Sequence, residues 1–289
     1  MEIVTDSGTD LGMSPEQLEA LGIHVIPLVV TLDGTSYREG VDIEPDTFYA
    51  HLSVAEGLPT TSQPSPGDFA EVYEQIASRG SEILSVHISS GLSGTLEAAR
   101  TGATLVPGAK ITHVDTKTLS AASGWQVEAA ARAARAGWAK ERILALMEGI
   151  SAATESLYTL KELKYLIHGG RISHMKGLIA SLLNIKPLIG VEKVHGTYVQ
   201  LGQARTFGKA VQKVAEHATS QLAPGSALRT QVLHSNNPEG AVMLRDHLDR
   251  LFDCTWLPLG SISLVLGAHT GPSMVGVAYG PLEAFAAIP

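Results

Sequence analysis

The chain of 289 residues is sparing with several residue types, and each scarcity excludes a class of protein. Its one cysteine, Cys254, excludes an internal disulfide and a cysteine-rich zinc site. Aromatic residues make up only 5% and the net charge is −8, so the stacking platforms and clustered cations of nucleic-acid-binding proteins are missing. No apolar run is long enough to span a bilayer. We therefore expect neither a nucleic-acid partner nor a membrane-spanning segment.

The sequence also lacks the glycine motifs that cradle phosphates. It has no G-x-x-x-x-G-K-[ST] loop and no G-x-G-x-x-G after a predicted strand. We expect no cofactor, no metal and no phosphoryl-transfer activity of its own. The first residues, Met1 to Ser7, resemble a strand more than the basic start and apolar core of a signal peptide. With the single cysteine, this predicts a cytoplasmic location.

The 44% share of apolar residues and the length favour two domains of an α/β protein. Strands alternate with helices from Met1 to about Ala153, which is typical of a mainly parallel sheet with flanking helices. The remainder predicts a second α/β domain with a mixed sheet. The predicted domains are residues 1–153 and 154–289. Single elements that the structure can test are strands at His24–Leu32 and Ile262–Leu266, and helices at Trp125–Trp138 and Leu178–Leu183.

A serine-rich loop is the first candidate functional feature. The run Ile83–Ile88 predicts a buried strand and Leu96–Leu105 a helix, with three serines and two glycines between them. Small side chains and free N–H groups at the start of a helix favour an anion. Ser93 and its neighbours are therefore candidates for holding a carboxylate. The same composition also suits a loop that only caps its own helix.

Two further hydroxyl-rich segments, 60–65 and the predicted polar turn 269–273, strengthen the anion hypothesis. The same residues leave two other functions open. In a serine hydrolase, Ser93 would be the nucleophile and His269 the base, oriented by Asp6 or Asp115. However, Thr95 stands where the nucleophile elbow G-x-S-x-G has its second glycine. Alternatively, the serine loop would bind a sugar phosphate or a nucleotide.

Six short motifs, in order along the whole chain, resemble the DegV family. They are Thr5-Asp6-Ser7, Thr61-Ser62-Gln63-Pro64-Ser65, Ser89-Ser90-Gly91-Leu92-Ser93-Gly94-Thr95, Gly169-Gly170-Arg171-Ile172, Leu183-Asn184-Ile185-Lys186-Pro187 and His269-Thr270-Gly271-Pro272. The resemblance implies a two-domain protein that binds a long-chain fatty acid, such as palmitate, stearate or oleate, between its domains. Such proteins are similar to the FakB proteins, the acyl-carrying subunits of bacterial fatty acid kinase. The resemblance implies that the carrier subunit is not itself an enzyme.

The resemblance also implies roles for individual residues. Thr61 and Ser93 would offer hydroxyls to the carboxylate, and His269 would complete the hydrogen-bond network. Arg171 matches a position implicated in docking a separate kinase subunit, which makes an acyl phosphate that feeds phospholipid synthesis. The remaining residues assigned to the ligand site are Ser62, Gly94 and Thr270. Transient contact with a membrane surface is compatible with this role.

One departure from the family pattern concerns the pocket itself. Ser273 stands where many relatives have glycine, and we expect it to add a polar contact or to narrow the pocket.

Elementary energetics agree with a lipid ligand, because hydroxyls and N–H groups can satisfy a buried carboxylate without a buried cation. Burial of about fourteen methylenes at roughly 0.8 kcal/mol each offers about 11 kcal/mol before the costs of association.

Overall fold

The structure is a computed structural model that describes residues 1–175, 178 and 185–289. The strands are β1 (Glu2–Asp6), β2 (Ile23–Ile26), β3 (Val29–Leu32), β4 (Thr35–Arg38), β5 (Thr60–Ser62), β6 (Ile83–His87), β7 (Ile111–Asp115), β8 (Glu155–Thr159), β9 (Lys186–Val191), β10 (Tyr198–Ala204), β11 (Ala227–His234), β12 (Asp253–Trp256), β13 (Gly260–Ser261) and β14 (Val275–Pro281). The helices are α1 (Pro15–Leu21), α2 (Pro45–Val54), α3 (Pro66–Ala77), α4 (Thr95–Thr104), α5 (Ser120–Arg135), α6 (Lys140–Ala153), α7 (Lys164–Gly169), α9 (Phe207–His217), α10 (Pro238–Asp249) and α11 (Leu264–Thr270). Short 3-10 turns are η1 (Ser7–Thr9), η2 (Ala218–Ser220) and η3 (Leu282–Phe285).

The first half of the chain builds a four-stranded parallel sheet in the order β2-β1-β6-β7. Its strands carry apolar side chains on both faces because helices cover both. One face packs on α5 and α6 through Val127, Ile143 and their neighbours, and the other packs on α3 and α4 through Phe69 and Tyr73. The predicted parallel sheet with flanking helices is confirmed.

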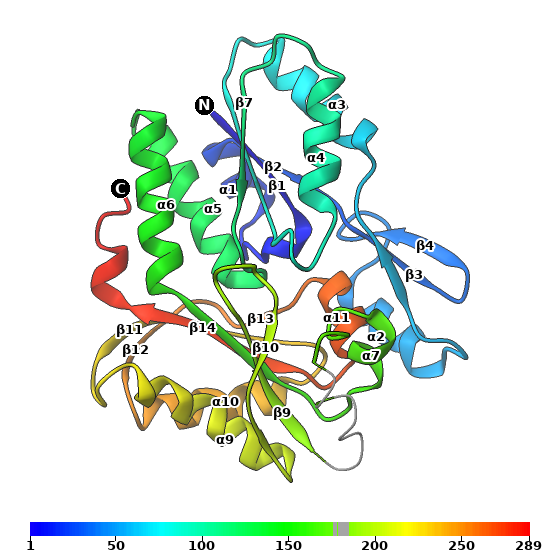
Figure 1. Ribbon diagram of the computed structural model, residues 1–289, viewed down its shortest axis with the longest axis vertical. Coiled ribbons are helices and arrows are strands. Elements are labelled where there is room, and N and C mark those ends of the chain that lie inside the picture. The colour runs from blue at the N-terminus through cyan, green and yellow to red at the C-terminus, as the bar shows by residue number, and fades with distance from the viewer. Residues whose placement is uncertain (176–177, 179–184) are drawn as a thin grey trace.

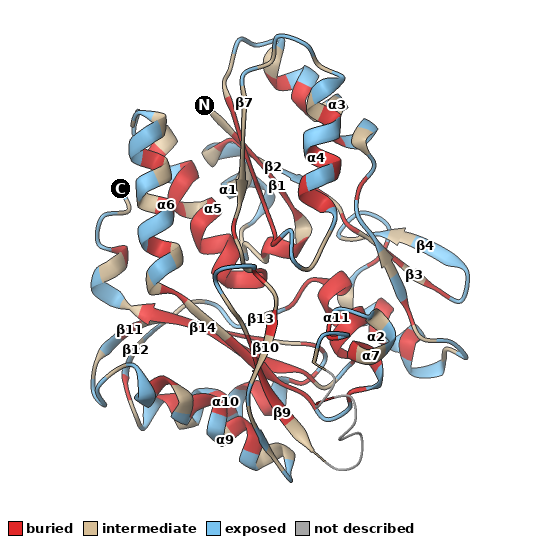
Figure 2. Ribbon diagram, in the orientation of Figure 1, coloured by how far each residue is buried: buried red, intermediate tan, exposed pale blue. Residues whose placement is uncertain are grey.

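The second half forms a seven-stranded mixed sheet in the order β10-β9-β8-β14-β11-β12, with β13 beside β11. A hairpin lies at one edge of the sheet, where β9 and β10 pair antiparallel on either side of His195 and Gly196. Helices α9 and α10 cover one face of the sheet. The other face turns toward the first half of the chain, and this burial of both faces is visible in Figure 2.

A three-stranded sheet, β4-β3-β5, was not predicted. The expected single strand at His24–Leu32 is wrong, because it divides into β2 of the parallel sheet and β3 of the small one. Pro27 stands at the division, and proline has no N–H to continue a ladder. We call residues 29–62, which contain β3, β4, α2 and β5, the arm. Figure 1 shows β3 and β4 extending beside α2, α7 and α11.

The predicted strand at Ile262–Leu266 is also wrong, since most of this run lies in helix α11. A short apolar run has no period that separates a buried strand from a buried helix. Every residue of α11 is buried, and the helix ends at Gly271 with φ 73°. His269, expected in a turn, therefore lies in the last turn of a helix. Leu264, Val265, Leu266 and Ala268 of α11 belong to one large core cluster, and Figure 2 shows the helix buried.

Two further expectations concern helices. The helix predicted at Trp125–Trp138 spans Ser120–Arg135, because its small first residues pack closely against the turn after β1. A Cβ at Gly124 would lie 2.3 Å from the carbonyl oxygen of Thr9. Most of the helix predicted at 178–183, and the first two residues of the motif 183–187, lie outside the described residues.

The two larger sheets draw on residues 2–115 and 155–281 respectively. We retain the domain boundary between 153 and 154 as a proposal.

Candidate functional site

The candidate site begins with a hydrogen bond between distant parts of the chain. The hydroxyl Oγ1 of Thr61 lies 2.8 Å from Nε2 of His269, although 208 positions separate them. Thr61 is held by β5, where it pairs with Val30 of β3, and His269 is held by α11. The arm and the second half of the chain thus meet at this pair.

His269 is electrically neutral near pH 7. Burial, and then electrostatic repulsion from Arg171 and His168, lower the pKa of the imidazole to about 4. The residue as a whole is 8% exposed. Gly169 lies against it so closely that a Cβ there would be 2.1 Å from Nδ1. Position 169, in the motif 169–172, therefore requires glycine, because a larger residue would collide with the imidazole of His269.

The serine loop joins this pair from the carboxyl end of β6. The Ser93 hydroxyl lies 2.8 Å from Oγ1 of Thr95, and its backbone N–H donates to the carbonyl of Ser89 over 3.0 Å. The Ser89 hydroxyl donates to the carbonyl oxygen of Gly196 at the tip of the β9–β10 hairpin, over 2.8 Å. The loop is therefore fixed both by its own hydrogen bonds and by the second half of the chain.

Arg171 extends from the end of α7 toward the serine loop. Its Nε donates to the carbonyl oxygen of Leu92 over 3.4 Å, and its Nη1 donates to that of Gly169 over 2.5 Å. The side chain is exposed on its outer side. Arg171 thus ties the serine loop to the glycine motif and places one positive charge beside His269.

These segments enclose a cavity with about 440 Å³ of unfilled space, part of it open to solvent, which we call the mouth. Its polar lining residues are Thr61, Ser62, Gln63, Ser93, Arg171 and His269. Leu28, Ile88, Leu92 and Val265 supply apolar wall. Hydroxyl, amide and neutral imidazole groups dominate the polar surface, so the mouth can donate several hydrogen bonds to an anion.

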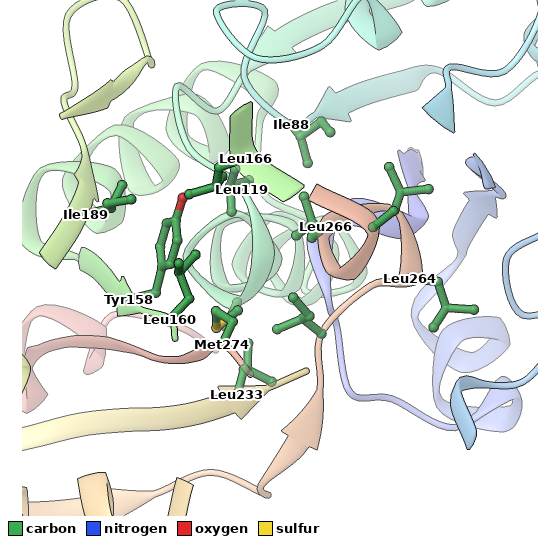
Figure 3. Close-up of a cluster of buried hydrophobic side chains, with 14 of the residues drawn as sticks. Ile88, Leu119, Tyr158, Leu160, Leu166, Ile189, Leu233, Leu264, Leu266 and Met274 are labelled. Atoms are coloured by element: carbon green, nitrogen blue, oxygen red, sulfur yellow. The ribbon is translucent and has the colours of Figure 1, made fainter. Parts of the chain in front are cut away.

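A second cavity adjoins the mouth and is lined mainly by apolar side chains, with Ser120, Ser156 and Thr270 also in its wall. About 410 Å³ of unfilled space lies there, part of it open to solvent, and Leu119, Tyr198 and Leu266 line both cavities. We call it the tail cavity. Its other apolar lining residues are Ala121, Leu157, Tyr158, Leu233, Ile262, Met274, Val277 and Ala278. Figure 3 shows several of these side chains in one buried cluster between α11 and the mixed sheet.

Five of the seven predicted site residues line the mouth, and two do not. The five are Thr61, Ser62, Ser93, Arg171 and His269. Thr270 lines the tail cavity, with its hydroxyl donating to the carbonyl of Leu266 over 3.0 Å. Gly94 lies outside both cavities and packs against the amide of Gln63.

Two other expectations about single residues change. The Ser273 hydroxyl accepts the N–H of Lys161 over 3.0 Å and lines neither cavity, so it adds no contact to the pocket. Gln63 was not assigned to the site but lines the mouth. Its place directly after Thr61 and Ser62 in the same motif was the signal that could have identified it.

In the serine hydrolase alternative, Asp6 or Asp115 would orient His269, but both aspartates are hydrogen-bonded to other residues. Asp6 lies at the carboxyl end of β6, where its Oδ2 is 2.9 Å from Nδ1 of His87 and accepts the N–H of Ile88. His87 Nε2 lies 2.6 Å from the Ser85 hydroxyl, and all three side chains are fully buried. Asp115 binds Ser90. No triad through Ser93 and His269 is formed among the described residues, and the buried chain through Ser85 has no route for a substrate.

Among the residues that the structure describes, no group of three or more His, Cys, Asp or Glu side chains could hold a metal ion. None of the described helices combines the length and apolar character that crossing a membrane requires. The site is thus a polar mouth joined to an apolar cavity in an α/β protein, an arrangement typical of a binding protein for an amphipathic anion.

Comparisons with known proteins agree with this class. A model described as uncharacterised protein, DegV family, matches residues 1–282. A DegV domain-containing protein of Deinococcus radiodurans is 36% identical over 279 residues, covering 96% of this chain and 95% of the relative. The chain belongs to the DegV family.

Two solved structures extend the comparison. A DegV family protein from Thermus thermophilus, described as fatty-acid-binding, superposes with a TM-score of 0.87 at 30% identity, covering 97% of this chain and 99% of the other. DegV from Bacillus subtilis, described as a fatty acid binding protein, gives 0.84 at 27% identity, covering 97% and 98%. The α/β fold, with one parallel and one mixed sheet, is therefore that of relatives described as fatty-acid-binding.

Proposed function

We propose that this protein binds a long-chain fatty acid, with the carboxylate in the mouth and the hydrocarbon chain in the tail cavity. The single observation that carries the proposal is the junction of the two cavities at Leu119, Tyr198 and Leu266. A polar end that continues into an apolar slot matches a molecule with one acidic head and one greasy tail. The fatty-acid-binding relatives support the same ligand class.

The head group would be held by donors that carry no charge. If Nε2 of His269 bears the hydrogen and donates to Thr61, the Thr61 hydroxyl is left free to donate to the carboxylate. Ser93 offers a second hydroxyl from the opposite wall. A buried carboxylate that accepts two or three hydrogen bonds avoids most of its desolvation cost. Such a carboxylate also keeps its nucleophilic oxygen available.

We further propose that the protein is a carrier, which presents the carboxylate to a separate kinase subunit for acyl-phosphate formation. Two observations support this role. The chain has no phosphate-cradling motif with which to hold ATP, and Arg171 stands exposed at the rim of the mouth, where a partner can reach it. The acyl phosphate would then feed phospholipid synthesis, with the carrier in the cytoplasm.

Native mass spectrometry of the protein purified from cells tests ligand class directly. We expect a co-purified C14 to C18 acid that is lost under denaturing conditions. A ligand that carries phosphate would instead support the sugar-phosphate or nucleotide alternative. Turnover of a chromogenic ester, abolished in Ser93→Ala, would support the hydrolase alternative. Either result contradicts the proposal.

The carrier role needs its own experiment, because a protein can bind a lipid without presenting it. Arg171→Ala should bind fatty acid as the wild type does but lose phosphorylation by a reconstituted kinase subunit with ATP. Arg100→Ala is the matched control, since Arg100 is an exposed arginine on α4 that pairs with Glu97. Equal phosphorylation of all three proteins would contradict the docking role of Arg171.

A further inference from the structure

The helix that carries His269 is held at its other end by a carboxylate from the arm. Oε1 of Glu39, in the segment just after β4, accepts the N–H of Leu264, the first residue of α11. Oε2 of Glu39 accepts the Ser263 hydroxyl over 2.7 Å. A carboxylate at this position satisfies a free N–H at the positive end of the helix.

The arm therefore contacts α11 at both ends. Glu39 lies within the arm, and its own N–H donates to the carbonyl of Leu28, the residue just before β3, over 3.0 Å. Thr61 is fixed to the same arm by pairing with Val30, and it bonds His269 in the last turn of the helix. The distance between the two contacts on the arm must match the length of α11. A shift at the first turn is then transmitted to the Thr61–His269 pair.

We propose that Glu39 is a positioning residue for His269, and hence for recognition of the acidic head group; this rests on the proposed fatty-acid-binding function. Glu39 lines neither the mouth nor the tail cavity, so it acts through α11 and without touching the ligand. Nothing in its own sequence surroundings, Tyr37-Arg38-Glu39-Gly40, marks it as part of a site.

The side chain of Glu39 positions α11 by accepting hydrogen bonds through both of its oxygens. Its Oε2 receives the Ser7 hydroxyl over 2.6 Å as well as that of Ser263. Ser7 in turn accepts the N–H of Leu28 over 3.0 Å, so its hydrogen is directed to Glu39. Both carboxylate oxygens thus face donors. A glutamine can keep the N–H of Leu264 on its amide oxygen, but its NH₂ group then faces two hydroxyls at once, and the hydrogens of both Ser7 and Ser263 lose their acceptor.

Asp10 provides a matched comparison at the same helix end. Its Oδ1 accepts the N–H of Ser263 over 2.7 Å, and its Oδ2 accepts the Ser120 hydroxyl over 2.5 Å. In Asp10→Asn the amide oxygen can keep the Ser263 bond, while the NH₂ donates to a Ser120 hydroxyl that rotates to accept. Asp10 has φ 43°, a conformation that asparagine tolerates. Asp10 lines neither cavity.

Both acids are costly to bury, which indicates that their hydrogen bonds matter. Burial raises the pKa of Glu39 and of Asp10. The acidic neighbours that face them are each other and Asp6, and Asp6 is itself bonded to His87. The two substitutions therefore change acids of the same buried cluster, and they differ in how many of the surrounding donors keep an acceptor.

The experiment compares two ligands that share a tail, hexadecanoate and hexadecan-1-ol, on delipidated wild type and variants at pH 7.5. We expect Glu39→Gln to weaken hexadecanoate about tenfold, the equivalent of one lost hydrogen bond, while hexadecan-1-ol changes less than about threefold. Asp10→Asn should alter neither affinity. Glu39→Gln in a His269→Ala background should cause no additional loss for hexadecanoate, because the residue through which Glu39 acts is gone.

Several results would overturn the inference. They are equal losses for both ligands in Glu39→Gln, an unchanged hexadecanoate affinity, an equal effect of Asp10→Asn, or additive losses in the double variant. Retained binding of the alcohol shows that the variant is folded. If the wild type binds neither ligand, the proposed function itself fails, and that outcome is distinct from a failure of Glu39 to act through His269.

Discussion

The mouth and the tail cavity are neighbours, but they are built in different ways. The mouth takes its polar groups from four separate segments: the arm, the serine loop, the end of α7 and the end of α11. The tail cavity is lined mainly by the mixed sheet, the start of α5 and α11, and most of its side chains are apolar. The contrast assigns different tasks to the two regions. The tail cavity supplies affinity, which grows with buried area, and the mouth supplies orientation and recognition of the acid.

The largest effect should come from the tail. Dodecanoate has four fewer methylenes than hexadecanoate, and at roughly 0.8 kcal/mol each it should bind about two hundredfold more weakly. Titration calorimetry with both acids measures this ratio. The corresponding pair of alcohols should show the same ratio, because the mouth contributes equally to both members. A ratio below about tenfold would mean that the tail cavity does not hold the chain.

The next effect concerns the charge of the mouth. The folded pKa of His269 is about 4, below the ordinary value of 6.5, so protonation favours the unfolded chain. Its contribution to stability is complete above pH 6.5 and is lost as the pH falls toward 4, by about 3 kcal/mol.

Urea unfolding of the wild type and His269→Gln between pH 7.5 and 4 measures this loss. The wild type should lose its advantage over the variant as the pH falls. His113, whose pKa burial also lowers to about 4, titrates in both proteins and cancels. A difference between the two proteins that stays constant with pH would show that the imidazole is not held neutral.

A smaller effect is expected from a single hydroxyl in the mouth. Thr61→Val keeps the shape of the side chain but removes the donor, so hexadecanoate should bind about tenfold more weakly, and hexadecan-1-ol much less so. Thr60→Val is the matched control, because Thr60 is exposed on the same strand. An equal loss for both ligands would place the acid somewhere other than beside Thr61.

The smallest effect on binding should be that of Arg171→Ala. The guanidinium donates to the backbone carbonyls of Leu92 and Gly169 and is partly solvated, so its removal should change hexadecanoate affinity less than about threefold. Fluorescence displacement is precise enough to measure this. A hundredfold loss would instead make Arg171 a partner of the carboxylate and would remove the distinction between its binding and docking roles.

The fold and the polar mouth could largely be predicted from the sequence because they follow local rules. The strand before the serine loop and the helix after it have clear apolar patterns, and the motif containing Thr61 is rich in hydroxyls. The arm could not be predicted, since Pro27 alone marks the point at which one apolar run serves two sheets. The helical state of α11 was also hidden, because its apolar residues are buried on every side.

Glu39 shows the limit of reading motifs. Its neighbours in the sequence are those of an ordinary exposed turn, and the donors that it satisfies, Ser7, Ser263 and Leu264, come from distant segments. Thr270 is the opposite case: it lies in a motif assigned to the ligand site, but its hydroxyl donates to the carbonyl of Leu266 in its own helix. Contacts between distant segments decide both cases, and no local pattern records them.

A crystal structure of the hexadecanoate complex tests the central claim most directly. The account predicts that one carboxylate oxygen lies within hydrogen-bond distance of Oγ1 of Thr61 and the other near Oγ of Ser93. It also predicts that the chain passes between Leu119 and Leu266 into the tail cavity. A carboxylate outside the mouth, or a hydrocarbon chain that leaves the tail cavity empty, would contradict it.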